Sequence, residues 1–419
     1  MGPPVPNLWL PYTQMQTSAA PLRALRTEGS RITLEDGREL LDAVSSWWTA
    51  CHGYNHPHIL SAMEKQLRDM PHVMFGGLVH HPAEELADRL INMLPGALER
   101  VFFADSGSVA IEVALKIAVQ YWLNQGQMGR TRFLSFRDGY HGDTLAAMSV
   151  TDPDEGMHAL FRGYLPEQIS APLPRDGAST SQFHQLLDKH KHQIAAVIIE
   201  PLVQCAGGMK MHMPDVLKIV ADAARKAGVL FICDEIAVNF GRAGTMFAYP
   251  QGNVTPDIIC LGKALTGGTV NLAATVTTAG VFDAFLSDNA DNALMHGPTY
   301  MASPLACTAA NASLDLFENE PRLDQVAKIE GQLEKDLRPL TDVPGVLDVR
   351  VKGAIGAVEV EHLYDLAWLM EQFVKAGIWL RPFGNVIYTM PPFTVTTEEI
   401  SAITASIQKI LPRWAERAP

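Results

Sequence analysis

Short apolar runs alternate with segments of helical length in the middle of the chain, and this alternation constrains the fold more than any other feature. Segments long enough for helices separate several of the runs, for example residues 108–124 and 214–227. Strands that alternate with helices form βαβ units and a mostly parallel sheet with helices on its faces. The chain is therefore predicted to be an α/β protein with buried strands at residues 101–104, 131–136, 195–199, 229–233 and 258–261.

The two ends of the chain follow a different pattern. Strand signals occur at residues 31–41, around an Asp36-Gly37 turn, and again at 346–351 and 357–360. Helices dominate beyond residue 304, and a capping box, Thr396-x-x-Glu399, precedes a last helix with one isoleucine face. We therefore expect a large domain at residues 49–304 and a smaller α+β domain that combines residues 1–48 with residues 305–419.

Bulk properties exclude several classes of protein. The 419 residues are 47% hydrophobic and carry a formal net charge of −13, which argues against non-specific binding to nucleic acid or to an anionic membrane. The five cysteines are odd in number and form no CxxC motif, so we expect reduced thiols. Residues 1–6 resemble no signal peptide, and no apolar run approaches the roughly 18 residues of a membrane span. A cytoplasmic protein is expected.

Two charged residues stand where predicted strands end. Asp234 closes the run 229–233, and Lys263 follows the run 258–261. Ligands of open α/β sheets bind at the carboxyl ends of the strands, and an aspartate with a lysine is the pair that pyridoxal phosphate needs. On these two residues alone, Asp234 could equally be a solvated strand end or a metal ligand, and Lys263 a surface lysine.

Two other ligand sites are not supported by the sequence. A P-loop is excluded, because Asp257 stands where the motif needs glycine and Ala264 where it needs serine or threonine. Histidines gather at residues 52–58 and 80–81, but no His-Glu-x-x-His occurs and His56-Pro57 predicts an extended or turn conformation. No metal site is expected.

A phosphate cup is predicted where the strand at residues 101–104 leads into the next helix. Asp105-Ser106-Gly107-Ser108 places a Gly–Ser turn at the helix N-terminus, where free backbone N–H groups favour an anion. Plain helix capping by Ser106 or Ser108 explains the same residues.

Aromatic and basic residues suggest the walls of a pocket. Trp47 and Trp48 are adjacent, so we expect at most one of them to reach a given pocket, with core packing as the alternative. Arg381 is a single arginine among apolar residues and suits a bidentate clamp on a carboxylate, although a structural ion pair fits as well.

Taken together, these segments resemble the fold-type I, class III pyridoxal-phosphate aminotransferases, from about Trp9 to the C-terminal helix. The motifs most resemble the branch that moves the amino group of S-adenosylmethionine to 8-amino-7-oxononanoate, which gives 7,8-diaminononanoate in biotin biosynthesis by a ping-pong reaction. The resemblance rests on six segments, Ser45-Ser46-Trp47-Trp48, His52-Gly53-Tyr54-Asn55-His56-Pro57, Asp105-Ser106-Gly107-Ser108-Val109-Ala110, Gly139-Tyr140-His141-Gly142-Asp143-Thr144, Met295-His296-Gly297-Pro298-Thr299 and Arg381-Pro382-Phe383-Gly384.

The resemblance implies pyridoxal phosphate as cofactor and a role for each matching residue. Lys263 would form the Schiff base and carry the proton, Asp234 would pair with the ring nitrogen, and Tyr140 would stack on the ring. Gly107 and Ser108 would bind the phosphate. The cup would be completed by the neighbouring subunit of a homodimer, through Pro298 and Thr299. Substrates would contact Tyr12, Trp47, Arg242, Gly297 and Arg381, with Arg381 binding a carboxylate.

The resemblance also bears on the donor. Relatives that use glutamate as the donor carry a Gly-Glu-Ala-Gly stretch after an Ile-Glu-Pro strand. The glutamate of that stretch helps to gate the arginine that binds the donor. No glutamate follows Glu200 here before residue 209, which suits an enzyme with another donor. A broad ω-transaminase that uses amines or lysine-like donors is the alternative, and a non-catalytic pyridoxal-phosphate binder is a third possibility.

The chain departs from the family pattern at a few positions, which bear on substrate range and rate. Asn239 stands at a glycine position and can tolerate a left-handed conformation, so we expect the turn before Arg242 to survive. The other departures are Val238, Ala243, Cys205 and Ser303.

Overall fold

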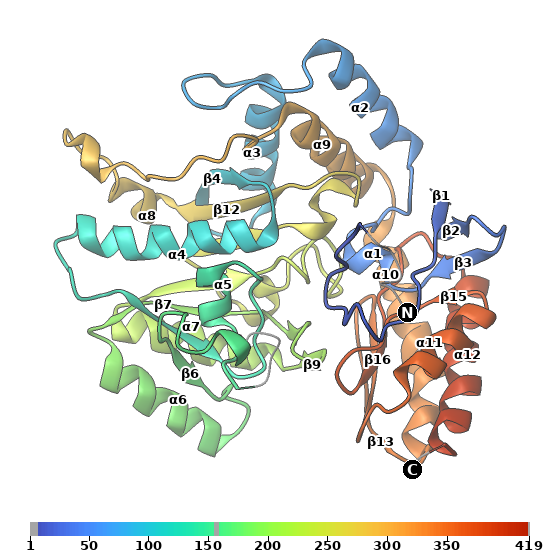
Figure 1. Ribbon diagram of the computed structural model, residues 1–419. Coiled ribbons are helices and arrows are strands. Elements are labelled where there is room, and N and C mark those ends of the chain that lie inside the picture. The colour runs from blue at the N-terminus through green and yellow to red at the C-terminus, as the bar shows by residue number, and fades with distance from the viewer. Residues whose placement is uncertain (1–6, 155–158, 418–419) are drawn as a thin grey trace.

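The computed structural model describes residues 7–154 and 159–417 (Figure 1). Residues 1–6, on which the expected absence of a signal peptide depends, lie outside this range. None of the helices in the described part is long and apolar enough to cross a membrane.

A seven-stranded sheet forms the centre of the molecule. Its order is β4-β12-β11-β10-β7-β5-β6, and the strands from β11 to β6 are parallel. The predicted α/β fold is confirmed, and the five predicted strands are found as β4 (Leu98–Ala104), β5 (Arg132–Phe136), β7 (Ile194–Ile199), β10 (Leu230–Asp234) and β11 (Ile258–Leu261). The other two strands of the sheet, β6 (Ile169–Ala171) and β12 (Ala273–Thr278), were not predicted.

The strand β12 was not predicted and runs antiparallel to both of its neighbours, β4 and β11. Its inner residues are alanines, threonines and one valine, so no apolar run marked it. The buried Thr275 hydroxyl donates to the carbonyl of Ala110 at 2.8 Å, which satisfies this polar group inside the sheet.

The sheet is buried on both faces, which explains the continuous apolar runs of its strands. Side chains of β10 alternate between two cores, with Phe231 and Cys233 in one and Leu230 and Ile232 in the other. The flanking helices are α4 (Gly107–Asn124), α5 (Leu145–Val150), α6 (Gly177–His190), α7 (Pro214–Ala227) and α8 (Ala279–Asp283).

The N-terminal and C-terminal parts of the chain meet beside this sheet (Figure 1). One four-stranded sheet has the order β1-β2-β3-β15, so a C-terminal strand pairs in parallel with an N-terminal one. A second sheet is β13-β14-β16. Their bounds are β1 (Ala24–Glu28), β2 (Arg31–Leu34), β3 (Glu39–Asp42), β13 (Val346–Lys352), β14 (Ile355–Val360), β15 (Ile378–Trp379) and β16 (Val386–Thr389).

The helices of these outer parts fall into two groups. The helix α9 (Pro304–Asn319) packs on α2 (Pro57–Asp69) and α3 (His81–Met93). The helices α10 (Arg322–Leu337) and α11 (Leu366–Lys375) pack on α12 (Thr397–Ala415), which has the predicted capping box. Since α9 contacts helices of the large domain, the domain boundary at residues 304 and 305 stays a prediction.

Short elements complete the chain. They are α1 (Ser45–Trp48), β8 (Val203–Gln204), β9 (Lys210–Met211) and the 3₁₀ turns η1 (Ala159–Phe161), η2 (Tyr249–Gly252), η3 (Lys263–Thr266), η4 (Ala290–Asn292) and η5 (Arg338–Asp342).

A buried histidine links three segments of the fold. Nδ1 of His52 accepts a hydrogen bond from Nε of Arg322 at 3.0 Å, and Nε2 lies 3.0 Å from the Ser313 hydroxyl. Burial, then the positive charge of Arg322 and that of His56, lower the pKa of His52 to about 3. The neutral ring is therefore part of the packing between α9, α10 and the segment before α2.

This arrangement predicts that stability falls with acidification. Below the ordinary pKa of 6.5 the unfolded chain protonates His52, whereas the folded chain does not until about pH 3. The unfolding free energy should fall by up to ~1.4 kcal/mol per pH unit through this group. Urea unfolding between about pH 5 and 7 measures the slope. His52→Gln should be less stable at pH 7 but should lose less stability on acidification. Equal slopes would contradict the prediction.

Candidate active site

Two tryptophans enter the site from a left-handed turn. Ser45, Ser46, Trp47 and Trp48 all have positive φ, between 47° and 75°. Trp48 lines both of the neighbouring cavities described below, and Trp47 lines the larger one. The expectation that at most one of the pair reaches a given pocket is therefore wrong, because it assumed side chains that alternate, whereas this turn brings both indoles to one cavity.

The carboxylate of Asp42 holds this turn. Oδ1 accepts from the backbone N–H of Val44 at 2.9 Å, and Oδ2 accepts from that of Ser46 at 2.7 Å. The Tyr54 hydroxyl donates to Oδ2 at 2.5 Å. A buried charge with several donors is a strong local anchor, so the sequence Ser45–Trp48 can keep a conformation that L-residues disfavour.

Lys263 begins η3 directly after β11 and lines both cavities. Its ammonium lies 4.4 Å from the centre of the Trp48 ring. Burial lowers the pKa of Lys263, although the nearby Cys205, Asp234, Glu200 and Asp143 act in the opposite direction. The structure thus gives a desolvated amine at the carboxyl edge of the sheet, as a Schiff-base nucleophile requires.

Asp234 and Glu235 follow one another and serve different purposes. Oδ2 of Asp234 lies 2.7 Å from Nδ1 of the buried His141, and Oδ1 accepts from the backbone of Ile236. Glu235 instead accepts backbone N–H groups of Ala248 and Tyr249 on the other side of the strand. Asp234 lines the smaller cavity, whereas Glu235 stabilises a loop.

A second buried acid supports the site from behind. The two oxygens of Glu200 accept the backbone N–H groups of Tyr140 at 2.9 Å and Cys205 at 3.0 Å. Burial is the main reason that the pKa of Glu200 is raised to about 7, while His141 acts to lower it and Asp234 to raise it. Glu200 thereby fixes the loop that carries Tyr140 and His141.

The smaller cavity, of about 210 Å³, has the character of an anion cradle. The Ser106 hydroxyl caps α4 by accepting a hydrogen bond from the N–H of Val109. Helix capping by Ser106 is therefore confirmed, and it leaves the N–H groups that follow available for a phosphate. Gly107 and Ser108 begin the helix and line the cavity. A side chain at Gly142 would place its Cβ 2.3 Å from Oγ of Ser108, so the backbone approaches closely here.

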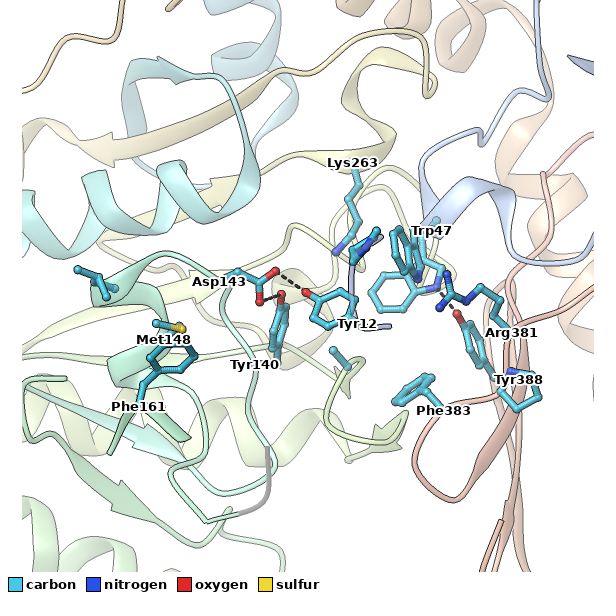
Figure 2. Close-up of a pocket in the computed structure, with 15 residues that line it drawn as sticks. Tyr12, Trp47, Tyr140, Asp143, Met148, Phe161, Lys263, Arg381, Phe383 and Tyr388 are labelled. Carbon is cyan, nitrogen blue, oxygen red and sulfur yellow. Dashed lines mark hydrogen bonds between the residues drawn. The ribbon is translucent and has the colours of Figure 1, made fainter. Parts of the chain in front are cut away.

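The larger cavity, of about 1020 Å³, extends from Arg381 past Lys263 to Phe161 (Figure 2). Tyr12 and Tyr140 both donate hydroxyl hydrogen bonds to Asp143, and the bond from Tyr140 measures 2.9 Å. Burial, then the hydrogen bond to Asp143, raise the pKa of Tyr12 to about 12, so this phenol remains a donor.

Arg381 occupies one end of the larger cavity. Its guanidinium carbon lies 5.0 Å from the ring centre of Trp47 (Figure 2). Among the described residues it has no carboxylate partner, so the ion-pair alternative is not what the structure shows. A stacked guanidinium with unfilled bonding capacity suits an anionic ligand.

The structure does not bring every predicted residue to the cavities. Gly297, Pro298 and Thr299 line neither cavity of their own chain, and Thr299 is exposed. Arg242 is fully buried outside both cavities, because its Nη1 donates to the carbonyls of Pro391 at 2.6 Å and Ala354 at 3.3 Å. Its predicted contact with substrate stays a prediction.

The turn before Arg242 keeps its shape in a way that differs from the expectation. Phe240 and Gly241, not Asn239, take the left-handed conformation. The side-chain amide of Asn239 donates to the carbonyl of Gly262 at 3.3 Å, next to Lys263. Val238 is fully buried in the core. Asn239 thus bonds to the residue next to Lys263, and neither Val238 nor Asn239 lines either cavity.

Several site residues had no assigned role from the sequence. A signal was present for some of them, because His141, Asp143, Trp48 and Phe383 belong to segments that carry the resemblance, and Glu200 belongs to the Ile-Glu-Pro stretch. No local pattern marked the others, which reach the larger cavity only through the fold: Leu145, Met148, Phe161 and Tyr388.

The chain is similar to known aminotransferases. A family model described as aminotransferase class-III matches residues 12–411. The adenosylmethionine-8-amino-7-oxononanoate aminotransferase of Corynebacterium glutamicum is 45% identical over 96% of this chain and 96% of its own. The enzyme of that name from Mycobacterium leprae is 46% identical over 96% and 94%.

Two solved structures are similar over nearly the whole chain. The enzyme of the same name from Methanocaldococcus jannaschii has a TM-score of 0.91 and 34% identity, over 96% of this chain and 97% of that one. A PLP-bound amine transaminase from an uncultivated Pseudomonas species has a TM-score of 0.90 and 33% identity, over 97% and 98%.

The cradle predicts that Gly142→Ala weakens cofactor binding. The new Cβ would meet Ser108, and φ at this position is +128°, which an L-residue adopts at a cost of ~1–3 kcal/mol. We expect the Kd for pyridoxal phosphate, titrated by absorbance on the cofactor-free protein, to rise on the order of tenfold or more. Gly163→Ala is the matched control, since φ is +88° there and nothing lies within 4 Å. An equal Kd in both variants would refute the cradle.

Proposed function

The chain belongs to the class-III aminotransferase family, and on this premise we propose that it transfers the amino group of S-adenosylmethionine to 8-amino-7-oxononanoate, forming 7,8-diaminononanoate in biotin biosynthesis. The observation that carries the proposal is the larger cavity, where Arg381 lies apart from Lys263 across aromatic walls (Figure 2). Such spacing suits a substrate whose carboxylate is separated from its reacting carbon by an apolar chain. Relatives of that name, 45% and 46% identical, support it.

We propose pyridoxal phosphate as the cofactor, and three features of the chain fit it. The Gly107–Ser108 cradle would hold its phosphate, Asp234 its ring nitrogen and Lys263 its aldehyde carbon. The close approach at Gly142 and the buried carboxylate of Asp234 support this fit. When bound, the cofactor supplies an electron sink for the carbon that loses or gains the amino group.

The chain's own residues handle the protons and the orientation. The lowered pKa of Lys263 favours the neutral amine on Nζ, which can accept a proton and return it. His141 fixes the position of the Asp234 carboxylate through their 2.7 Å contact. Arg381 would bind the substrate carboxylate, while Trp47 and Tyr12 line the same cavity and would orient the substrate chain.

A panel of donors tests this function in the half-reaction. The holoenzyme should lose its cofactor absorbance band with S-adenosylmethionine and regain it with 8-amino-7-oxononanoate, in a ping-pong pattern. Lys263→Ala should lower turnover by at least about 10³-fold, because no other described group can move the proton from that position. Full turnover in Lys263→Ala would disprove the role of the lysine.

The alternative function is a broad-specificity ω-transaminase. The similarity to the amine transaminase structure, at 33% identity, supports this alternative. Simple amines or lysine that react as fast as S-adenosylmethionine in the same panel would support this alternative. A holoenzyme that reacts with no amine would instead leave a non-catalytic binder of pyridoxal phosphate.

We propose that the active unit is a homodimer. The segments 72–80 and 295–302 lie against each other. The rings of His72 and Tyr300 are 4.6 Å apart, and His80 donates a hydrogen bond to the carbonyl of Ala302. Both segments present apolar side chains to solvent. Large exposed apolar patches mark interfaces. The more exposed members are Met74, Leu78, Val79, Met295 and Tyr300. The exposure of Thr299 away from its own cradle fits a residue that serves the partner's site.

Subunit complementation tests the proposed role of Thr299. Thr299→Glu should repel the phosphate of the cofactor, and Lys263→Ala removes the reacting amine, so each variant alone should be inactive. When equal amounts are unfolded together and refolded, half of the dimers are mixed, and each mixed dimer has one intact site. About one quarter of the wild-type activity should return. No recovery would mean that Thr299 does not act across the interface.

The five cysteines of the chain are free and buried. Free thiols are typical of reducing compartments, and we propose a cytoplasmic enzyme on that basis.

A further inference from the structure

The larger cavity continues beyond the reacting centre, on the side opposite Arg381. Leu145, Met148 and Phe161 line this end, and Figure 2 shows Met148 and Phe161 past Tyr140 and Asp143, away from the arginine. We propose that this apolar end binds the adenosine group of S-adenosylmethionine, and this inference rests on the proposed function. Leu145, Met148 and Phe161 would then determine the donor specificity.

The acceptor does not need this end of the cavity. Its carboxylate and apolar chain lead from the reacting ketone toward Arg381, and only its small amino-bearing end extends the other way. The donor differs, because its reacting carbon also carries a side chain that ends in a bulky nucleoside. A ping-pong enzyme binds donor and acceptor in the same cavity. The apolar end, which the acceptor leaves empty, is therefore available for the nucleoside of the donor.

Charge favours the same direction for the donor. The side chain of S-adenosylmethionine carries a positive sulfonium between the reacting carbon and the nucleoside. Asp143 is the single carboxylate among the described residues that line the larger cavity, and it lies between Lys263 and the apolar end (Figure 2). Tyr12 and Tyr140 donate their hydroxyl hydrogen bonds to this carboxylate. A carboxylate attracts a sulfonium, whereas Arg381 at the opposite end repels it.

The chemistry of the apolar end suits a nucleobase. Leu145 and Met148 come from α5, and Phe161 comes from η1, so two elements form its two sides. Leu145 and Phe161 are about half exposed in this chain, at 48% and 45%. Thioether, aromatic and aliphatic groups pack well on the flat face of a purine, and the partly open mouth leaves its polar edges in contact with water.

The test separates the donor from the acceptor. In a ping-pong reaction kcat/KM is measured for each substrate separately. Phe161→Ala should lower kcat/KM for S-adenosylmethionine about tenfold or more, while kcat/KM for 8-amino-7-oxononanoate stays within about twofold. Leu145→Ala, on the other wall, should act in the same direction. The matched control is Tyr164→Ala, since Tyr164 is an exposed aromatic of the same segment that does not line the cavity.

A direct binding probe accompanies the kinetics. Adenosine should inhibit the wild-type holoenzyme competitively against S-adenosylmethionine, and Phe161→Ala should weaken this inhibition about tenfold. An unchanged donor kcat/KM in both Phe161→Ala and Leu145→Ala, or an equal loss for both substrates, overturns the adenosine site but leaves the proposed function intact. A wild-type holoenzyme with no half-reaction from S-adenosylmethionine overturns the proposed function itself.

Discussion

The left-handed backbone at Ser45–Trp48 is the constraint on which the larger cavity depends. Such a conformation costs roughly 1–2 kcal/mol per L-residue, so four in succession need compensation from their surroundings. The Asp42 carboxylate supplies part of it by accepting two backbone N–H groups and the Tyr54 hydroxyl. The Ser45 hydroxyl adds a bond to the carbonyl of Met390, which ties the turn to the C-terminal part of the chain.

Other walls of the cavity share this unusual backbone. Tyr12 and Lys263 also have positive φ, at 51° and 46°, although both are ordinary L-residues. Strain of this kind persists only where neighbouring contacts over-determine the conformation. Here the contacts are the Tyr12–Asp143 hydrogen bond and the packing of Lys263 against Trp48. These backbone conformations thus help to set the positions of Tyr12 and Lys263 in the wall of the cavity.

What could be predicted from the sequence depended on local patterns. The strands β10 and β11 were predicted because both faces of the sheet are buried, which makes their sequences continuously apolar, and the charges at their ends located Asp234 and Lys263. The strand β12 was not predicted, because its alanines and threonines form no continuous apolar run. The joint placement of Trp47 and Trp48 could not be foreseen, since the turn is held by the folded positions of Asp42 and Tyr54 and by Met390 from the C-terminal part. The burial of Arg242 outside both cavities could not be foreseen either, because its partners, Ala354 and Pro391, belong to the C-terminal part.

The adjacent acids Asp234 and Glu235 show how the fold assigns a role that the residue type leaves open. Both are buried carboxylates at the end of β10, on opposite faces of the strand. Glu235 receives backbone donors and no cationic side chain, and burial raises its pKa to about 8. Asp234 instead lies against the ring of His141. Glu235 thus stabilises a loop on the other side of the strand. The carboxylate available to the proposed ring nitrogen is therefore that of Asp234, which lines the smaller cavity.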